Sequence, residues 1–247
     1  MSSQPDSSQR DSAQPGSSRP GGSQPDSSQP GSARPGSSDA RRLAAGYLRD
    51  GDPTGWFEPL YAEAGAGRAA VPWDVPEASA HLRAYPLPPG EGRRALVVGC
   101  GPGRDAEHIA AAGYATTAFD ISPTAIELAR SRHRDTPVDY VVADLLNPPG
   151  EWRQAFDLVL ESNNVQALPA AIRAAAIAAV GTFVAPGGTL LVLAAAAVTG
   201  DADGPPWPLS RDEVEAFAGD GLTLVSVERT AAPGSPLHSR WRAVLTR

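Results

Sequence analysis

The sequence predicts an α/β fold: a mostly parallel, doubly wound sheet of seven strands, with N-terminal helices and a disordered N-terminal tail ahead of it. From Arg94 onward, short apolar runs alternate with helical patterns, which is typical of parallel strands joined by helices. A glycine loop, Gly99–Gly103, directly follows the first apolar run. Open α/β sheets bind nucleotide-like ligands at such a loop. The last two strands are joined without a helical pattern, which favours antiparallel pairing there.

Composition divides the chain near residue 40. Residues 1–40 contain almost only Ser, Gln, Pro, Gly, Asp and Arg, and the heptapeptide SQPDSSQ occurs both at Ser3 and at Ser23. These repeats have no apolar face to bury, so we expect a disordered tail rather than a solenoid. Residues 41–247 have the composition of one globular domain. Within it we expect a helical lid over 41–90 and the sheet over 91–247.

The charge and cysteine content exclude several classes of partner. The formal net charge is −7, and the sequence has no basic cluster to attract nucleic acid or an anionic membrane. No apolar stretch reaches the length of a membrane-spanning helix, which needs about 18 residues. The single cysteine, Cys100, forms neither an internal disulfide nor a zinc site, and the four histidines show no metal-binding spacing. We therefore expect a cytoplasmic monomer without a bound metal.

Helices are placed by their caps and periodicity. Asp39 caps the first helix, Pro76 precedes the third, and Ser122 with Pro123 starts the helix after the second strand. Ser210 caps the last helix. The predicted helices are Asp39–Leu48, Trp56–Ala64, Glu77–Tyr85, Asp105–Ala112, Thr124–His133, Leu168–Val184 and Arg211–Ala218.

Strands are placed by apolar or alternating runs between turn residues. The predicted strands are Ala95–Val98, Ala115–Asp120, Val138–Ala143, Phe156–Leu160, Thr189–Leu193, Leu222–Glu228 and Arg240–Thr246. The segment Arg229–Ser239 is predicted to be a loop.

The glycine loop is the first candidate binding element. Gly99, Gly101 and Gly103 permit positive φ and a close approach of backbone to a ligand, and the following helix N-terminus favours anionic or polar groups. A dinucleotide fingerprint needs a small residue where this chain has Arg104. Arg104 therefore argues against a nicotinamide enzyme.

Three acidic segments follow successive strands. Asp120, beside Ile121, ends the second strand and can accept hydrogen bonds from a ribose diol. Asp144-Leu145 follows the third strand and suits the edge and face of a base. Glu161-Ser162-Asn163-Asn164 follows the fourth strand and faces the glycine loop if the first and fourth strands are neighbours. Each segment taken alone is also explained as a capped turn or strand end, and the order of all of them is the more specific signal.

At these residues the sequence resembles the class I S-adenosylmethionine-dependent methyltransferases. VVGCGPGRD, AFD, VVADLL, FDLVLES and VAPGGTLLVLA are similar to that family's successive motifs. The resemblance implies a Rossmann-like sheet whose last strand is antiparallel, with S-adenosylmethionine as the cofactor. The residues that it implies for cofactor binding are Gly99, Cys100, Gly101, Gly103, Asp120, Ile121, Asp144, Leu145, Glu161 and Ser162.

The two ends resemble a narrower group, the thiopurine, halide and thiol methyltransferase-like proteins. Trp56…Tyr61…Val71-Pro72-Trp73-Asp74 is similar to the group's lead-in, and the segments at Gly204 and Ser239 are similar to its C-terminal pattern. A thiol, halide or thiopurine-like acceptor is implied. Many members have an Asp-Arg ending where this chain has Glu161-Ser162, so the acceptor stays open, and an O- or N-methyltransferase of a natural product is an alternative.

Glu161 is the one candidate for a general base whose place in the predicted fold is near the site, and it can equally bind the cofactor's amino group.

Five further residues are candidates for contact with the acceptor or for a lid: Trp56, Trp73, Trp207, Asn163 and Asn164. Core packing is the other explanation for the tryptophans. A cofactor-binding protein without catalysis, whose tail or N-terminal helices serve a partner, is the second functional hypothesis.

Overall fold

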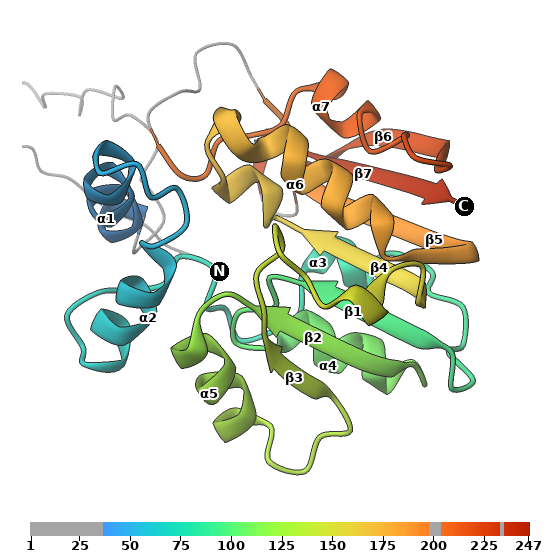
Figure 1. Ribbon diagram of the computed structural model, residues 1–247, viewed down its shortest axis with the longest axis horizontal. Coiled ribbons are helices and arrows are strands. Elements are labelled where there is room, and N and C mark those ends of the chain that lie inside the picture. The colour runs from blue at the N-terminus through green and yellow to red at the C-terminus, as the bar shows by residue number, and fades with distance from the viewer. Residues whose placement is uncertain (1–36, 198–203, 233–234) are drawn as a thin grey trace, which may run out of the picture. The chain divides into compact units, whose positions relative to one another are not determined.

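One seven-stranded sheet organises the molecule, with strand order β3-β2-β1-β4-β5-β7-β6 (Figure 1). The computed structural model describes residues 37–197, 204–232 and 235–247, so most of the predicted tail lies outside the described residues. The strands are β1 (Arg94–Val98), β2 (Ala115–Asp120), β3 (Asp139–Val142), β4 (Phe156–Ser162), β5 (Val184–Ala195), β6 (Thr223–Ala232) and β7 (Ser235–Thr246). β7 runs antiparallel to both β5 and β6, and the other pairs are parallel. The predicted fold class is confirmed.

Helices cover both faces of the sheet, as Figure 1 shows for α6 in front and α4 behind. The helices are α1 (Ser37–Arg49), α2 (Phe57–Gly65), α3 (Ala80–Arg83), α4 (Arg104–Ala111), α5 (Pro123–Arg132), α6 (Ala170–Thr182) and α7 (Arg211–Glu215), with short 3₁₀ turns η1 (Gly150–Trp152) and η2 (Val165–Ala167). Alternate residues of one strand enter different cores: Val97 packs with α3, α4 and α5, and Val98 packs with α6 and α7. This alternation explains why β1 is apolar at every position from Ala95 to Val98.

Two of the three predicted caps form. The Asp39 cap does not, because α1 begins at Ser37 and Asp39 lies in its first turn, where its carboxylate accepts the Ala70 N–H at 3.1 Å. The Ser122 hydroxyl accepts the Ala125 N–H at 3.0 Å, with Pro123 in the first turn of α5. Ser210 and Glu213 form a reciprocal capping box on α7. Each of these two caps is formed by residues within three positions of one another, so the local sequence is enough to predict it.

Two predicted segments were wrong. The helix predicted over Glu77–Tyr85 shortens to α3, because the Ser79 N–H donates to the Asp105 carboxylate of α4 at 2.7 Å instead of joining a helix. The predicted loop Arg229–Ser239 is largely strand, because β6 and β7 extend as a hairpin in which Thr230 pairs with Arg240. Pairing of the two backbones, rather than an apolar pattern, defines these strand ends.

Candidate functional site

The glycine loop lies at the carboxyl end of β1, where β4 is the neighbouring strand. Gly99, Gly101 and Gly103 have φ values of 57°, 50° and 90°. A Cβ atom on Gly99 would lie 1.3 Å from Asn164 Nδ2, and one on Gly101 would lie 2.8 Å from the Tyr61 hydroxyl oxygen. The loop therefore needs glycine for its backbone and for its neighbours. The Asn164 and Tyr61 side chains fill the space beside Gly99 and Gly101. We call the loop Gly99–Gly103 the cradle.

Asp120 joins this cradle from β2. One carboxylate oxygen accepts the Gly101 N–H at 2.9 Å, and the other accepts the Ser122 N–H at 3.0 Å. The side chain is 7% exposed. Burial raises the pKa of Asp120 to about 6, although the backbone hydrogen bonds lower it. Each oxygen keeps lone-pair capacity, so Asp120 shapes the loop and can still accept a hydroxyl.

The segment after β3 lies beside Asp120, since the Ala143 N–H donates to the Asp120 carbonyl at 3.0 Å. Asp144 is half-buried and accepts the Leu146 N–H at 2.9 Å, which makes a tight turn. Leu145 is buried in the core cluster that contains Phe119. The turn thus fixes Asp144 at the same edge as the cradle, while the Leu145 side chain anchors it.

Cys100, inside the glycine loop, has a poorly reactive thiol. Burial, and secondarily the Asp120 charge, raise the pKa of Cys100 well above its usual value. The thiol is therefore protonated at neutral pH, and the thiolate needed for a nucleophile is not formed.

Glu161 lies beside Val98 in the β1–β4 pairing, one residue before the glycine loop. Its Oε1 atom accepts the N–H groups of Asn164 at 2.8 Å and Val165 at 2.9 Å. Its Oε2 atom is buried and has no hydrogen-bond partner among the described residues. Burial raises the pKa of Glu161 to about 7, against the lowering effect of the two backbone bonds. A buried carboxyl with one unused oxygen is available to a ligand or to a proton.

The two asparagines after β4 contact different parts of the protein. The Asn164 amide lies against Gly99 in the cradle. Asn163, at φ 63°, accepts a hydrogen bond from the Arg240 guanidinium of β7 and donates to the Ser162 hydroxyl at 3.2 Å. The structure therefore brings Asn164 to the glycine loop and ties Asn163 to β7.

Aromatic side chains of the N-terminal segment cover the loop. Trp73 Nε1 donates to the Tyr61 hydroxyl at 2.6 Å, and both side chains approach Gly101. Trp56 is completely buried behind them, with its ring centroid 6.2 Å from that of Trp73. Tyr61 is a site residue that sequence reasoning left out, and its spacing between Trp56 and Trp73 was the available signal.

Trp207 lies at the other rim. Its backbone N–H donates to the Gln166 carbonyl at 2.7 Å, and Gln166 lies in the η2 turn that follows Asn164. The Arg173 guanidinium lies 6.0 Å from the Trp207 ring and pairs with Glu213 at 2.6 Å. Trp207 is thus held close to the end of β4 by buried polar contacts.

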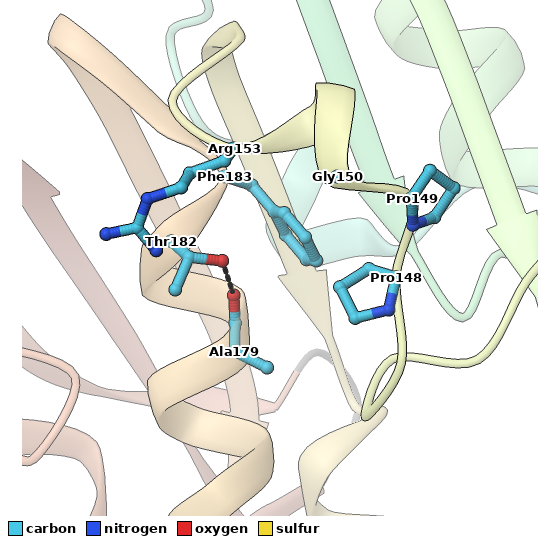
Figure 2. Close-up of a pocket in the computed structure, with 7 residues that line it drawn as sticks. All are labelled: Pro148, Pro149, Gly150, Arg153, Ala179, Thr182 and Phe183. Atoms are coloured by element: carbon cyan, nitrogen blue, oxygen red, sulfur yellow. Dashed lines mark hydrogen bonds between the residues drawn. The ribbon is translucent and has the colours of Figure 1, made fainter.

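A separate pocket of about 280 Å³ lies between the turn before η1 and the end of α6 (Figure 2). Prolines 148 and 149 and the Phe183 ring line it, and the Thr182 hydroxyl donates to the Ala179 carbonyl at 2.7 Å rather than into the pocket. None of the predicted site residues lines this pocket. With Arg153 as its one charged side chain, it lacks the converging polar groups of a reaction site.

No group of three or more His, Cys, Asp or Glu side chains among the described residues is arranged to hold a metal ion. No helix within the described ranges is long and apolar enough to cross a membrane.

Part of the chain is similar to known methyltransferases. Residues 95–188 match the model of a family described as a methyltransferase domain. The 2-heptyl-1-hydroxyquinolin-4(1H)-one methyltransferase of Mycobacteroides abscessus is 32% identical over 146 residues, which are 56% of this chain and 63% of that protein. The probable thiol methyltransferase 2 of Arabidopsis thaliana is 29% identical over 185 residues, 70% of this chain and 80% of that protein. The chain thus spans less than two thirds of the first of these relatives.

Solved structures share the fold. The N-methyltransferase NodS from Bradyrhizobium japonicum, in complex with S-adenosyl-L-homocysteine, has a TM-score of 0.57 at 18% identity. The match covers 76% of this chain and 97% of that protein.

Proposed function

We propose that this chain, which carries a methyltransferase domain over residues 95–188, transfers a methyl group from S-adenosylmethionine to a small acceptor molecule. The resemblance to class I S-adenosylmethionine-dependent methyltransferases is confirmed by that domain. The observation that carries the proposal is the hydrogen bond from the Gly101 N–H to Asp120, at 2.9 Å. It joins the glycine loop and the ribose-binding acid in one cradle.

The residues of the cradle fit this cofactor. The three loop glycines have positive φ, and Asp120 and Asp144 lie at one edge of the sheet, suited to ribose and adenine. The Glu161 Oε2 atom, buried without a partner among the described residues, suits the cofactor's amino group or an acceptor proton. When bound, the cofactor supplies a methyl group on a positively charged sulfur. Aromatic rings attract such a cation, and Tyr61 and Trp73 are the aromatic side chains that approach Gly101.

The acceptor is small in this proposal, because Asp120, Glu161 and Tyr61 are all buried, with Asp120 the most exposed at 7%. The net charge of −7 supports the absence of a nucleic-acid substrate, and a cytoplasmic monomer remains part of the proposal. With a pKa of about 7, Glu161 is matched to accept a proton from a thiol, whose usual pKa is about 8.5. A thiol or an acidic hydroxyl is therefore the acceptor that we favour, in keeping with what the two relatives are named for.

The experiment combines binding with transfer. S-adenosylhomocysteine binding is measured by calorimetry, and methyl transfer is measured with radiolabelled cofactor against thiols, iodide, hydroxyquinolones and amines. We expect binding, and transfer to a thiol or hydroxyl. Binding without transfer to any acceptor would favour the catalytically silent binding protein.

A Glu161→Gln variant separates the two roles of this residue. Its amide oxygen can still accept the Asn164 and Val165 N–H groups, so the turn is kept. We expect kcat to fall by about 10²-fold or more, which is the usual contribution of a general base to the rate, while cofactor affinity changes little. Asp157→Asn, at the opposite end of the same strand, is the control. Equal losses of kcat and cofactor affinity would make Glu161 a binding residue instead.

A further inference from the structure

The N-terminal segment reaches the core through one side chain of α2. We call residues 41–90, the segment predicted as a helical lid, the lid. The half-buried Glu58 side chain accepts a hydrogen bond from the Ser122 hydroxyl at 2.5 Å and from the Thr124 hydroxyl at 2.6 Å. The Thr124 N–H adds a third bond at 3.2 Å. A single carboxylate thus makes three contacts with a segment more than 60 residues away in the chain.

These contacts complete the cap of α5. The first position of that helix is Pro123, which has no N–H to satisfy. The Ser122 side chain satisfies Ala125, and Glu58 satisfies Thr124 from outside the helix. A negative charge also interacts favourably with a helix N-terminus. Closing the lid therefore finishes a helix end that the local sequence leaves incomplete.

The same contacts lead into the cradle. The Ser122 hydroxyl donates to Glu58, and the Ser122 N–H donates to Asp120, which in turn accepts the Gly101 N–H. One turn further along α2, Tyr61 lies over Gly101. The lid therefore contacts the cradle at two points of one helix.

The closed lid blocks access to the site. Tyr61 is 3% exposed and Asp120 is 7% exposed, so a ligand the size of a nucleoside reaches Asp120 only when the lid moves aside. Moving α2 away breaks all three contacts of Glu58.

We infer that Glu58 is a positioning residue that latches the lid over the bound cofactor and so sets the rate at which the cofactor leaves. The inference rests on the proposed function, because it needs a cofactor in the cradle. Glu58 does not contact the reacting atoms. It acts on the site through its hydrogen bonds with Ser122 and Thr124.

The test is the dissociation rate of S-adenosylhomocysteine, followed by tryptophan fluorescence in a stopped-flow mixer. We expect Glu58→Ala to raise this rate about tenfold, because hydrogen bonds to a charged group are lost. Glu58→Gln keeps the reach but loses the charge, and should fall between Glu58→Ala and the wild type. The matched control is Glu63→Ala, since Glu63 lies on the same helix but pairs with Arg42 inside the lid. We expect its rate to stay within about twofold of the wild type, as for other surface ion pairs.

Further readouts separate a latch from a merely structural role. Thr124→Val removes one hydroxyl contact on the core side, and combining it with Glu58→Ala should add little, because both act on the same latch. In steady state, the KM for S-adenosylmethionine should rise while kcat does not fall. Should Glu58→Ala fail to fold, Glu58→Gln and Thr124→Val still give the measurement.

Three results would overturn the inference, and they can be told apart. A wild type that binds S-adenosylhomocysteine and a Glu58→Ala protein that releases it at the same rate would exclude the latch alone. Equal acceleration in Glu63→Ala would exclude it as well. A wild type that does not bind S-adenosylhomocysteine would overturn the proposed function and the latch with it.

Discussion

Two buried carboxylates determine the chemistry of the cradle at the scale of single residues. Asp120 uses both oxygens to bind backbone N–H groups, whereas Glu161 uses only Oε1. Burial raises the pKa of Asp120 to about 6 and that of Glu161 to about 7. Since burial disfavours the charged form, the residue with the unused oxygen is also the one that titrates closest to neutral pH.

Because of Glu161, the free energy of unfolding should fall as the pH rises. Its pKa is raised from 4.5 to about 7, so between these values the folded protein keeps a proton that the unfolded chain releases. The contribution is present below pH 4.5 and lost as pH rises through 7. Its size is on the order of 3 kcal/mol. Between pH 4.5 and 8, we expect the free energy of unfolding of the wild type to fall relative to that of Glu161→Gln in urea titrations. Parallel pH profiles for the two proteins would contradict this.

The glycine loop is fixed at the scale of elements by the strands and helices around it. Behind it, the Tyr140 hydroxyl of β3 donates to the Glu107 carboxylate of α4 at 2.7 Å. A Cβ on Gly103 would lie 2.2 Å from that hydroxyl. The start of α4 is therefore held against β3, and the loop conformation depends on elements that are distant in sequence.

A pair of glycine substitutions tests this packing. Gly103 and Gly67 have φ values of 90° and 71°, but nothing lies within 4 Å of a Cβ on Gly67. Gly67→Ala should cost about 1–2 kcal/mol for the left-handed backbone alone. Gly103→Ala should cost measurably more, because Tyr140 must also move. Urea unfolding of both variants gives the comparison, and equal losses would show that Tyr140 does not constrain the loop.

Under the proposed function, S-adenosylhomocysteine should stabilise the whole molecule, because a ligand that binds only the folded state shifts the folding equilibrium. At a concentration 100 times its Kd, a ligand that binds only the folded state adds about 2.7 kcal/mol. For a chain of this size that corresponds to a rise in Tm of about 5–10 °C. Calorimetry with S-adenosylhomocysteine measures this shift, with adenosine alone as the weaker control. An unchanged Tm at saturating ligand would contradict binding to the cradle.

The elements with local signals are the ones that the sequence predicts well. β2 was predicted at its observed bounds, and Ser122 was correctly assigned as the cap of α5. The shortened α3 and the long β6–β7 hairpin were missed, since the first depends on Asp105 and the second on backbone pairing between strands. Among site residues, Tyr61 and Glu58 were left out. The groups that place them at the site, Gly101 for Tyr61 and Ser122 for Glu58, lie at least 40 positions away.

By itself, the sequence determined the fold class, the glycine loop and the order of the acidic segments, because hydrophobic period, caps and glycine positions act over a few residues. Only the tertiary structure decided which groups meet. It tied Gly101 to Asp120, left one oxygen of Glu161 without a partner among the described residues, and joined Glu58 to the start of α5. These contacts arise from strand order and lid docking, where residues far apart in the chain bury one another's polar groups.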